Sequence, residues 1–167
     1  MRYSAQFVKE KYKDSAIVVA ELGVHLGLNA LDMITNMNIS KMYLVDDYNT
    51  EKEIIGYTQS VARYREAYKN LEPYKGICEW FVTSTHIAYK YIPDESIDYV
   101  YIDAAHDYES VKQDLHLWWS KVKKGGVFAG HDYKEPLQPG VEQAVNEFIQ
   151  REGLELNVMG VDWWVIK

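Results

Sequence analysis

The stretch Ile17-Val-Val-Ala-Glu-Leu-Gly-Val-His-Leu-Gly27 decides the fold class of this chain. Its first six residues are apolar except for Glu21, a composition typical of a strand that is buried on both faces. Gly23 follows where such a strand must turn, and Gly27 stands where the next helix would begin. Glycine permits a tight turn and a close approach of the backbone to a ligand. The stretch therefore predicts a buried parallel strand, a ligand-binding turn and a helix over Leu28–Asn36.

Apolar runs of strand length alternate with helical periodicity along the rest of the chain. The other predicted strands are Met42–Val45, Glu79–Val82, Tyr99–Ile102, Val127–Ala129, Leu154–Met159 and Trp163–Ile166, the last two forming an antiparallel pair. This alternation predicts an α/β fold, a Rossmann-like doubly wound and mainly parallel sheet with helices on both faces. No linker or repeat divides the chain, so we expect a single domain over residues 1–167, with a short N-terminal segment 1–15 and no separate lid domain.

Capping residues predict where the remaining helices begin and end. Ser4 would cap a short helix before the first strand, and the capping box of Thr50 and Glu53 would start a helix that stops before Pro73. A third helix carries apolar residues from Val111 to Val122, and a fourth carries them from Val141 to Ile149 and ends near Gly153. The third is expected to hold lysines in its last turn and a glycine C-cap, namely Lys123, Lys124 and Gly125.

The charge balance argues against nucleic acid and membranes as partners. The chain carries 18 basic and 25 acidic residues, a net charge of −7, which repels phosphate backbones and anionic lipids. The longest basic cluster, Lys121 to Lys124, falls at a predicted helix end, where the helix dipole accounts for it. The single cysteine, Cys78, excludes an internal disulfide and cysteine-ligated zinc. Neither a signal peptide nor a membrane span is apparent, so we expect a cytoplasmic protein.

Carboxylates and histidines follow the predicted strands at the points where the strands end. Because the carboxyl ends of parallel strands meet at one edge of a sheet, where ligands bind, we expect these side chains to form one site. They are Glu21, Asp46, Asp103, His106, His131 and Asp132.

The first loop distinguishes among nucleotide-binding motifs. A dinucleotide loop has the pattern G-x-G-x-x-G, but His25 and Leu28 occupy the second and third glycine positions here. The loop instead resembles motif I of class I S-adenosylmethionine-dependent methyltransferases, E-x-G-x-x-x-G, through Glu21, Gly23 and Gly27. That resemblance implies that this loop, including His25, holds the methionine part of the cofactor.

The same resemblance implies further cofactor contacts. Asp46, nineteen residues after Gly27, would bind the ribose hydroxyls, as a carboxylate is able to do, with Asp47 beside it. Ser84 and Thr85 follow the third strand, where the family often contacts adenine. Acidic surroundings, to which Asp103 would contribute, also suit a sulfonium cation.

A longer match extends from about Ala16 to Phe148. Asp103-Ala-Ala-His106 and Gly130-His-Asp-Tyr133 resemble a methyltransferase branch with D-x-x-H after the fourth strand and G-H-D-Y after the fifth. The branch includes O-methyltransferases of sugars and other small molecules, and its macrolide-sugar relatives bind a divalent ion. It implies seven strands, one of them antiparallel near the C-terminus. By position, Asp103 and Asp132 would be metal ligands and His106 the general base.

One departure from the branch leaves the metal open. The sugar-methylating relatives have an acidic residue where this chain has His131, and catechol-type enzymes have an asparagine where it has Tyr133. Imidazole suits Zn, Fe or Ni better than Mg²⁺. His131 therefore has three open roles: a metal ligand, a second catalytic base or a packed histidine.

The sequence thus predicts a methyltransferase (EC 2.1.1.-) that uses S-adenosyl-L-methionine, with or without Mg²⁺ or another divalent metal, to methylate a small-molecule hydroxyl. The alternative is a cofactor-binding domain without activity, acting as a regulator or partner subunit. A nicotinamide oxidoreductase is disfavoured by the glycine spacing. Because little chain precedes the first strand, we also expect an open acceptor site, or one completed by a second copy or a partner subunit.

Overall fold

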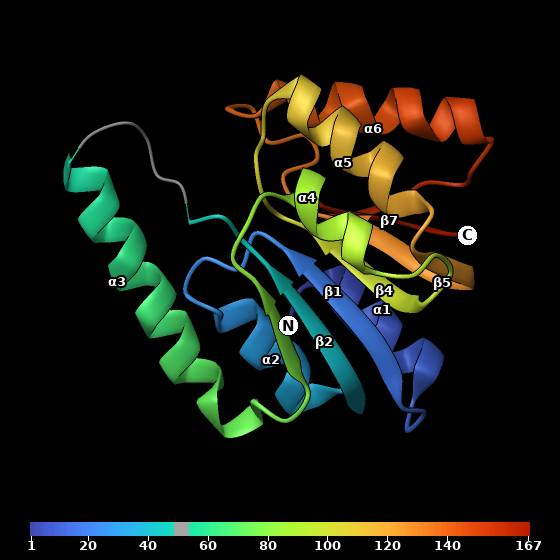
Figure 1. Ribbon diagram of the computed structural model, residues 1–167. Helices are drawn as coiled ribbons and strands as arrows, with labels where there is room; N and C mark the ends of the chain where they lie inside the picture. The colour runs from blue at the N-terminus through green and yellow to red at the C-terminus, as the bar shows by residue number, and fades with distance from the viewer. Residues whose placement is uncertain (49–53) are drawn as a thin grey trace.

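A computed structural model describes residues 1–48 and 54–167 of the chain, with side chains in the third helix from residue 59 onward (Figure 1). The predicted capping box of Thr50 and Glu53 lies outside the described residues. No helix in these ranges is long and apolar enough to cross a membrane.

Within residues 1–48 and 54–167, seven strands form one sheet in the order β3-β2-β1-β4-β5-β7-β6. They are β1 (Ile17–Leu22), β2 (Ile39–Val45), β3 (Cys78–Phe81), β4 (Ile97–Ile102), β5 (Val122–Gly130), β6 (Asn157–Met159) and β7 (Asp162–Ile166). Strand β7 runs antiparallel to both of its neighbours, and β1 to β5 pair in parallel. The predicted fold class is confirmed, including the reversed strand near the C-terminus. The strand order changes direction between β1 and β4, where sheets of this kind bind their ligands.

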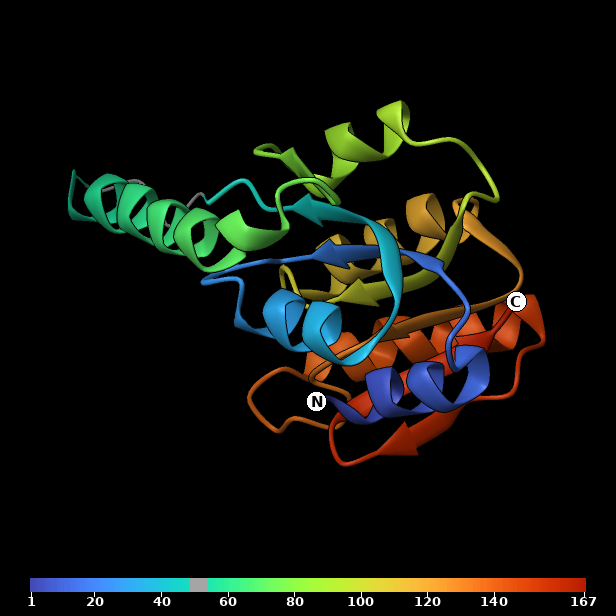
Figure 2. The ribbon, with the colours of Figure 1, turned by 90° about the horizontal axis from the view of Figure 1, so that it is seen from below.

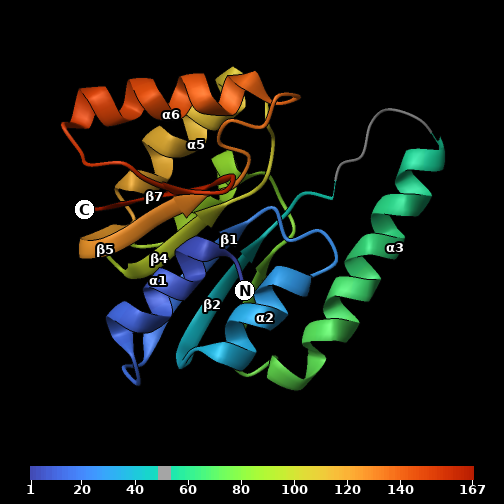
Figure 3. The same ribbon diagram turned by 180° about the vertical axis from the view of Figure 1, so that it is seen from behind.

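The described residues form six α-helices and two short 3₁₀ helices, of which α1 precedes the first strand and the others lie between strands. They are α1 (Tyr3–Tyr12), α2 (Leu28–Asn36), α3 (Ile54–Leu71), η1 (Glu72–Tyr74), α4 (Thr85–Ala88), η2 (Tyr89–Tyr91), α5 (Tyr108–Trp119) and α6 (Pro139–Glu152). Figures 1 and 3 show α1, α2 and α3 on one side of the sheet and α4, α5 and α6 on the other. Two apolar clusters fill the two interfaces, one around Met33 and Leu44 and one around Trp118 and Phe128. Figure 2 shows α3 extending past the arrowheads of β1 and β2.

The end of α5 differs from the prediction. The helix stops at Trp119, and Lys123, Lys124 and Gly125 belong to β5 instead of a helical last turn. The lysines are explained by partners in other segments, because Nζ of Lys121 lies 2.5 Å from a carboxylate oxygen of Asp94 and Nζ of Lys123 bonds to Asp98 at 2.9 Å. Two of the three lysines of the basic cluster are therefore paired with neighbouring acids, which makes the cluster a poor site for phosphate.

The predicted cap of the first helix is also wrong. Helix α1 begins at Tyr3 with Arg2 at the N-cap position, so Ser4 lies inside the helix. Ser4 is fully buried; its Oγ lies 2.9 Å from the hydroxyl of Tyr99, and its backbone N–H donates to Asp162 at 3.2 Å. These contacts fix the start of α1 against the sheet.

Candidate functional site

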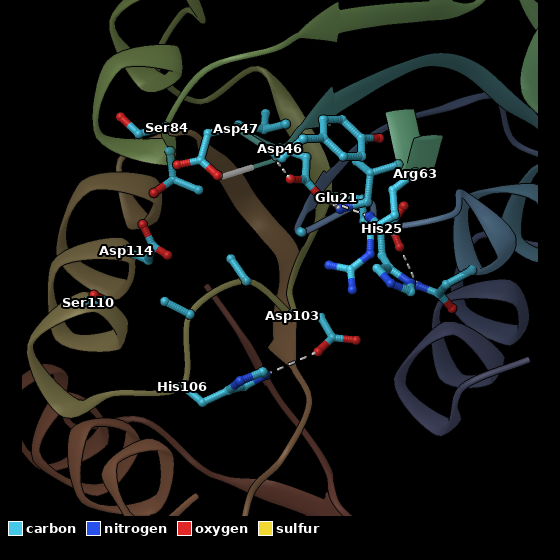
Figure 4. Close-up of a pocket in the computed structure, with 18 of the residues that line it drawn as sticks. Glu21, His25, Asp46, Asp47, Arg63, Ser84, Asp103, His106, Ser110 and Asp114 are labelled. Carbon is cyan, nitrogen blue, oxygen red and sulfur yellow. Dashed lines mark hydrogen bonds and ion pairs between the residues drawn. The ribbon is translucent and has the colours of Figure 1, made fainter. Parts of the chain in front are cut away.

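A cleft of about 910 Å³ opens at the carboxyl ends of β1, β2 and β4. Of the predicted site residues, those that line it are Glu21, Gly23, His25, Asp46, Asp47, Ser84, Thr85, Asp103 and His106. Three further predicted residues are not part of its lining, namely Gly27, His131 and Asp132. Figure 4 shows Glu21, His25 and Arg63 on one wall and Ser84 and Asp114 on the other.

The first turn brings three strand ends into close contact. Gly23 has a φ of +89°, and its N–H donates to the carbonyl of Val45 at 2.8 Å. The N–H of Asp103 donates to the carbonyl of Leu22 at 2.7 Å, so the end of β4 lies directly against the turn. Gly27 caps α2 with a φ of 72° and packs on α3, where an added Cβ would lie 3.1 Å from Leu71. Gly27 therefore helps to set the conformation of the loop without lining the cleft.

Asp46 organises this loop. Its Oδ2 accepts hydrogen bonds from the backbone N–H groups of Val24 and His25, each at 2.8 Å, and its Oδ1 accepts one from Tyr48 at 2.7 Å. A carboxylate oxygen offers two acceptor positions. Both positions of Oδ2 are used, and one position of Oδ1 is left for a ligand hydroxyl.

Glu21 is a buried acid at the floor of the cleft. One carboxylate oxygen accepts a hydrogen bond from the side-chain amide of Asn29 at 2.7 Å, whereas Oε2 has no partner among the described residues. Burial raises the pKa of Glu21 to about 8, the hydrogen bond from Asn29 opposes this rise, and the nearby Asp103 and Asp46 add to it. A positively charged ligand group would satisfy the unpaired oxygen and lower this pKa.

Glu21→Gln is therefore expected to stabilise the ligand-free protein in a pH-dependent way. A raised pKa in the folded state means that Glu21 costs no stability below about pH 4.5 and that its cost grows as the pH rises toward 8. The variant should melt roughly 5–10 °C above the wild type at pH 9 and close to it at pH 5. The exposed control Glu10→Gln should show no such difference. If the melting temperatures of Glu21→Gln and the wild type differed by the same amount at pH 5 and at pH 9, the raised pKa of Glu21 would be contradicted.

A second cluster follows β4 and β5. Nε2 of His106 lies 2.9 Å from Oδ2 of Asp132 and 3.7 Å from Oδ1 of Asp103, and Nδ1 of His131 lies 3.0 Å from Oδ1 of Asp132. The Asp103 carboxylate raises the pKa of His106 above its usual value; partial burial opposes this shift and Asp132 adds to it. Asp103, His131 and Asp132 each have a ligand atom within 4.8 Å of those of the other two, so the three could hold a cation between them.

Arg2 enters the same cluster. Its Nη2 lies 3.5 Å from Oδ2 of Asp103, and its Nη1 contacts Nε2 of His131. The sequence analysis did not single out Arg2, and no local pattern could have identified it, because its partners lie about a hundred or more residues away.

Asp114 and His86 contact each other in the wall of the cleft. The carboxylate of Asp114 on α5 is buried, and its Oδ1 lies 3.4 Å from Nε2 of His86. Burial raises the pKa of Asp114 to about 6, against the opposing effects of Thr85 and His86. The sequence carried a signal for this residue, since Asp114 shares a helical face with the apolar Val111 and Trp118.

The fold is α/β, and an acidic cleft lies at the point where the strand order changes direction. The comparisons identify the family of the chain. A family model described as a methyltransferase domain matches residues 20–133, and the chain belongs to this family. No curated protein sequence matches the chain.

Solved structures share the fold at low sequence identity. The O-methyltransferase NovP is 15% identical, with a TM-score of 0.71 over 98% of this chain and 78% of its own. A Clostridium thermocellum protein described as an rRNA methylase is 12% identical, with a TM-score of 0.70 over 98% and 95% of the two chains. Aeropyrum pernix fibrillarin, in complex with natively bound S-adenosyl-L-methionine, is 12% identical, with a TM-score of 0.62 over 90% and 66%.

Proposed function

We propose that the chain transfers a methyl group from S-adenosylmethionine to a hydroxyl group of a small molecule. The observation that carries this proposal is His106, whose imidazole stands at the edge of an acidic cleft with two carboxylates beside one ring nitrogen. A histidine oriented by carboxylates is a suitable base for a weakly acidic hydroxyl.

The charge and the free acceptors of the cleft support the proposed cofactor. Bound S-adenosylmethionine would supply a methyl group on a positively charged sulfur. The unpaired Oε2 of Glu21 would accept its ammonium group, and the remaining acceptor position of Asp46 would accept a ribose hydroxyl. The other cleft residues assigned to the cofactor are Gly23, His25, Asp47, Ser84, Thr85 and Asp103, and Gly27 would support their loop from outside the lining.

The acceptor half of the reaction depends on His106. With the carboxylates of Asp132 and Asp103 beside Nε2, a His106 protonated at Nε2 would leave the lone pair of Nδ1 for the proton of the hydroxyl. As the oxygen–hydrogen bond breaks, the oxygen bonds to the methyl carbon, the carbon–sulfur bond breaks, and S-adenosylhomocysteine leaves. The two carboxylates stabilise the imidazolium that forms.

Charge favours a small acceptor over RNA. Among the described residues that line the cleft, five are carboxylates and two are arginines, Arg2 and Arg63. With a net charge of −7, the chain repels a phosphate backbone. We further propose that a second copy of the chain or a partner subunit completes the acceptor side of the cleft.

The test is isothermal titration of the full chain with S-adenosylmethionine, with NAD as the control ligand, followed by an assay of S-adenosylhomocysteine formation. Sugars, phenols and an rRNA fragment are the acceptors. Micromolar binding and turnover with a hydroxyl compound support the proposal, and turnover with RNA alone overturns the acceptor class. Binding without turnover on any of these acceptors supports the second candidate, a non-catalytic cofactor-binding subunit. The contact of Arg2 with Asp103 favours this candidate, because Asp103 is one of the two carboxylates beside His106.

Asp46→Ala is expected to weaken the binding of S-adenosylmethionine at least tenfold. The substitution removes the ribose acceptor, the two backbone hydrogen bonds that shape the first loop and a third from Tyr48 after β2. Titration calorimetry checks this result against the exposed control Asp14→Ala, which should bind like the wild type. Unchanged affinity in Asp46→Ala would remove this residue from the cofactor site.

A further inference from the structure

We propose that the guanidinium of Arg2 occupies the position of a divalent cation in the cluster of Asp103, His131 and Asp132, so that the chain carries its own cation there. The inference concerns this cluster alone. It stands or falls independently of the acceptor and of methyl transfer.

The ligand atoms that a metal would need are already engaged. Nη1 of Arg2 contacts Nε2 of His131, and Nη2 lies 3.5 Å from Oδ2 of Asp103. An arginine only donates hydrogen bonds, so Nε2 of a neutral His131 must offer its lone pair and Nδ1 must carry the proton. This tautomer agrees with the contact of 3.0 Å between Nδ1 and Oδ1 of Asp132. Neither ring nitrogen is left for a metal while Arg2 is in place.

The charges of the cluster explain why a cation is held here. Asp103 and Asp132 both lie close to His106, and the buried Asp162 places an oxygen 3.9 Å from Nε2 of His131. Carboxylates this close destabilise one another unless a positive charge intervenes. A guanidinium stays charged at every physiological pH and is weakly hydrated, so it suits a partly buried acidic site.

The fold delivers Arg2 to this position. Ser4, two residues later, is anchored by the hydroxyl of Tyr99 and the carboxylate of Asp162, which fixes the backbone at the start of α1. The side chain of Arg2 makes no helix-capping hydrogen bond and is 39% exposed. It can therefore leave the cluster without unfolding α1, and a divalent ion must displace it in order to bind.

The test is the binding of Mn²⁺ to the full chain, measured by electron paramagnetic resonance and isothermal titration, with any purification tag removed. Arg2→Ala is compared with the wild type and with Lys9→Ala, which removes one positive charge from the exposed surface of the same helix. Arg2→Gln, which keeps a polar side chain without the charge, serves as a second variant in case Arg2→Ala does not fold. Circular dichroism verifies that each variant is folded.

We expect Arg2→Ala and Arg2→Gln to bind Mn²⁺ at least tenfold more tightly than the wild type and Lys9→Ala. Adding Asp132→Asn to the Arg2 variant should abolish this gain and so locate the ion in the cluster. Equal Mn²⁺ affinity in the Arg2 variants and the wild type would overturn the proposal. So would a gain that survives Asp132→Asn, because the ion would then lie elsewhere.

Discussion

Replacing Gly23 by alanine is expected to abolish cofactor binding and to lower the free energy of unfolding by at least about 3 kcal/mol. A Cβ at this position would lie 2.0 Å from the carbonyl oxygen of Asp103 and 2.8 Å from Cα of Ala104. Both are backbone atoms, and the N–H of Asp103 is held at 2.7 Å to the carbonyl of Leu22. The end of β4 therefore has to separate from β1, and the φ of +89° adds strain in any residue with a side chain.

Urea denaturation and titration with S-adenosylmethionine measure the two effects. The matched control is Gly76→Ala, because a Cβ at Gly76 meets no atom within 4 Å and its backbone is not in the left-handed region. The control should change stability by less than about 0.5 kcal/mol. If Gly23→Ala were as stable as the control, the close approach of the first turn to β4 would be wrong.

The elements that were predicted accurately are those with local signals. The bounds of β1 and α2 match the prediction because an apolar run and two glycines mark them within the segment itself. The end of α5 was misplaced because Lys123 finds its partner Asp98 twenty-five residues away, where no local rule detects it. The spacing of the residues in the sequence therefore could not distinguish a helix that ends in lysines from a strand whose lysines form ion pairs.

The same distinction applies to the site. Residues that follow strands could be grouped from the sequence, because a parallel sheet brings its strand ends to one edge. Glu21, Asp46 and Asp103 line one cleft for that reason. Arg2 was missed because its contact with His131 spans 129 residues and depends on how α1 packs against the sheet. The tertiary packing of α1 against the sheet places Arg2 in the site, so no local sequence pattern predicts it.

His106→Ala is expected to lower kcat for methyl transfer by about 10²–10⁴-fold and to leave the affinity for S-adenosylmethionine within about twofold of the wild type. The substitution removes the proton acceptor, whereas the first loop and the partners of Asp46 stay in place. Initial rates of S-adenosylhomocysteine formation with a hydroxyl acceptor, together with titration of the cofactor, check both parts.

The control His116→Ala removes an exposed histidine from α5 and should turn over like the wild type. Normal turnover in His106→Ala would exclude it as the base and would direct attention to His131, the other histidine beside Asp132. A joint loss of turnover and cofactor affinity would instead indicate that His106 holds the end of β4 in place, because its partner Asp103 lies directly against the first turn. Only the selective loss of kcat assigns proton transfer to His106, since binding reports on the loop and kcat on the base.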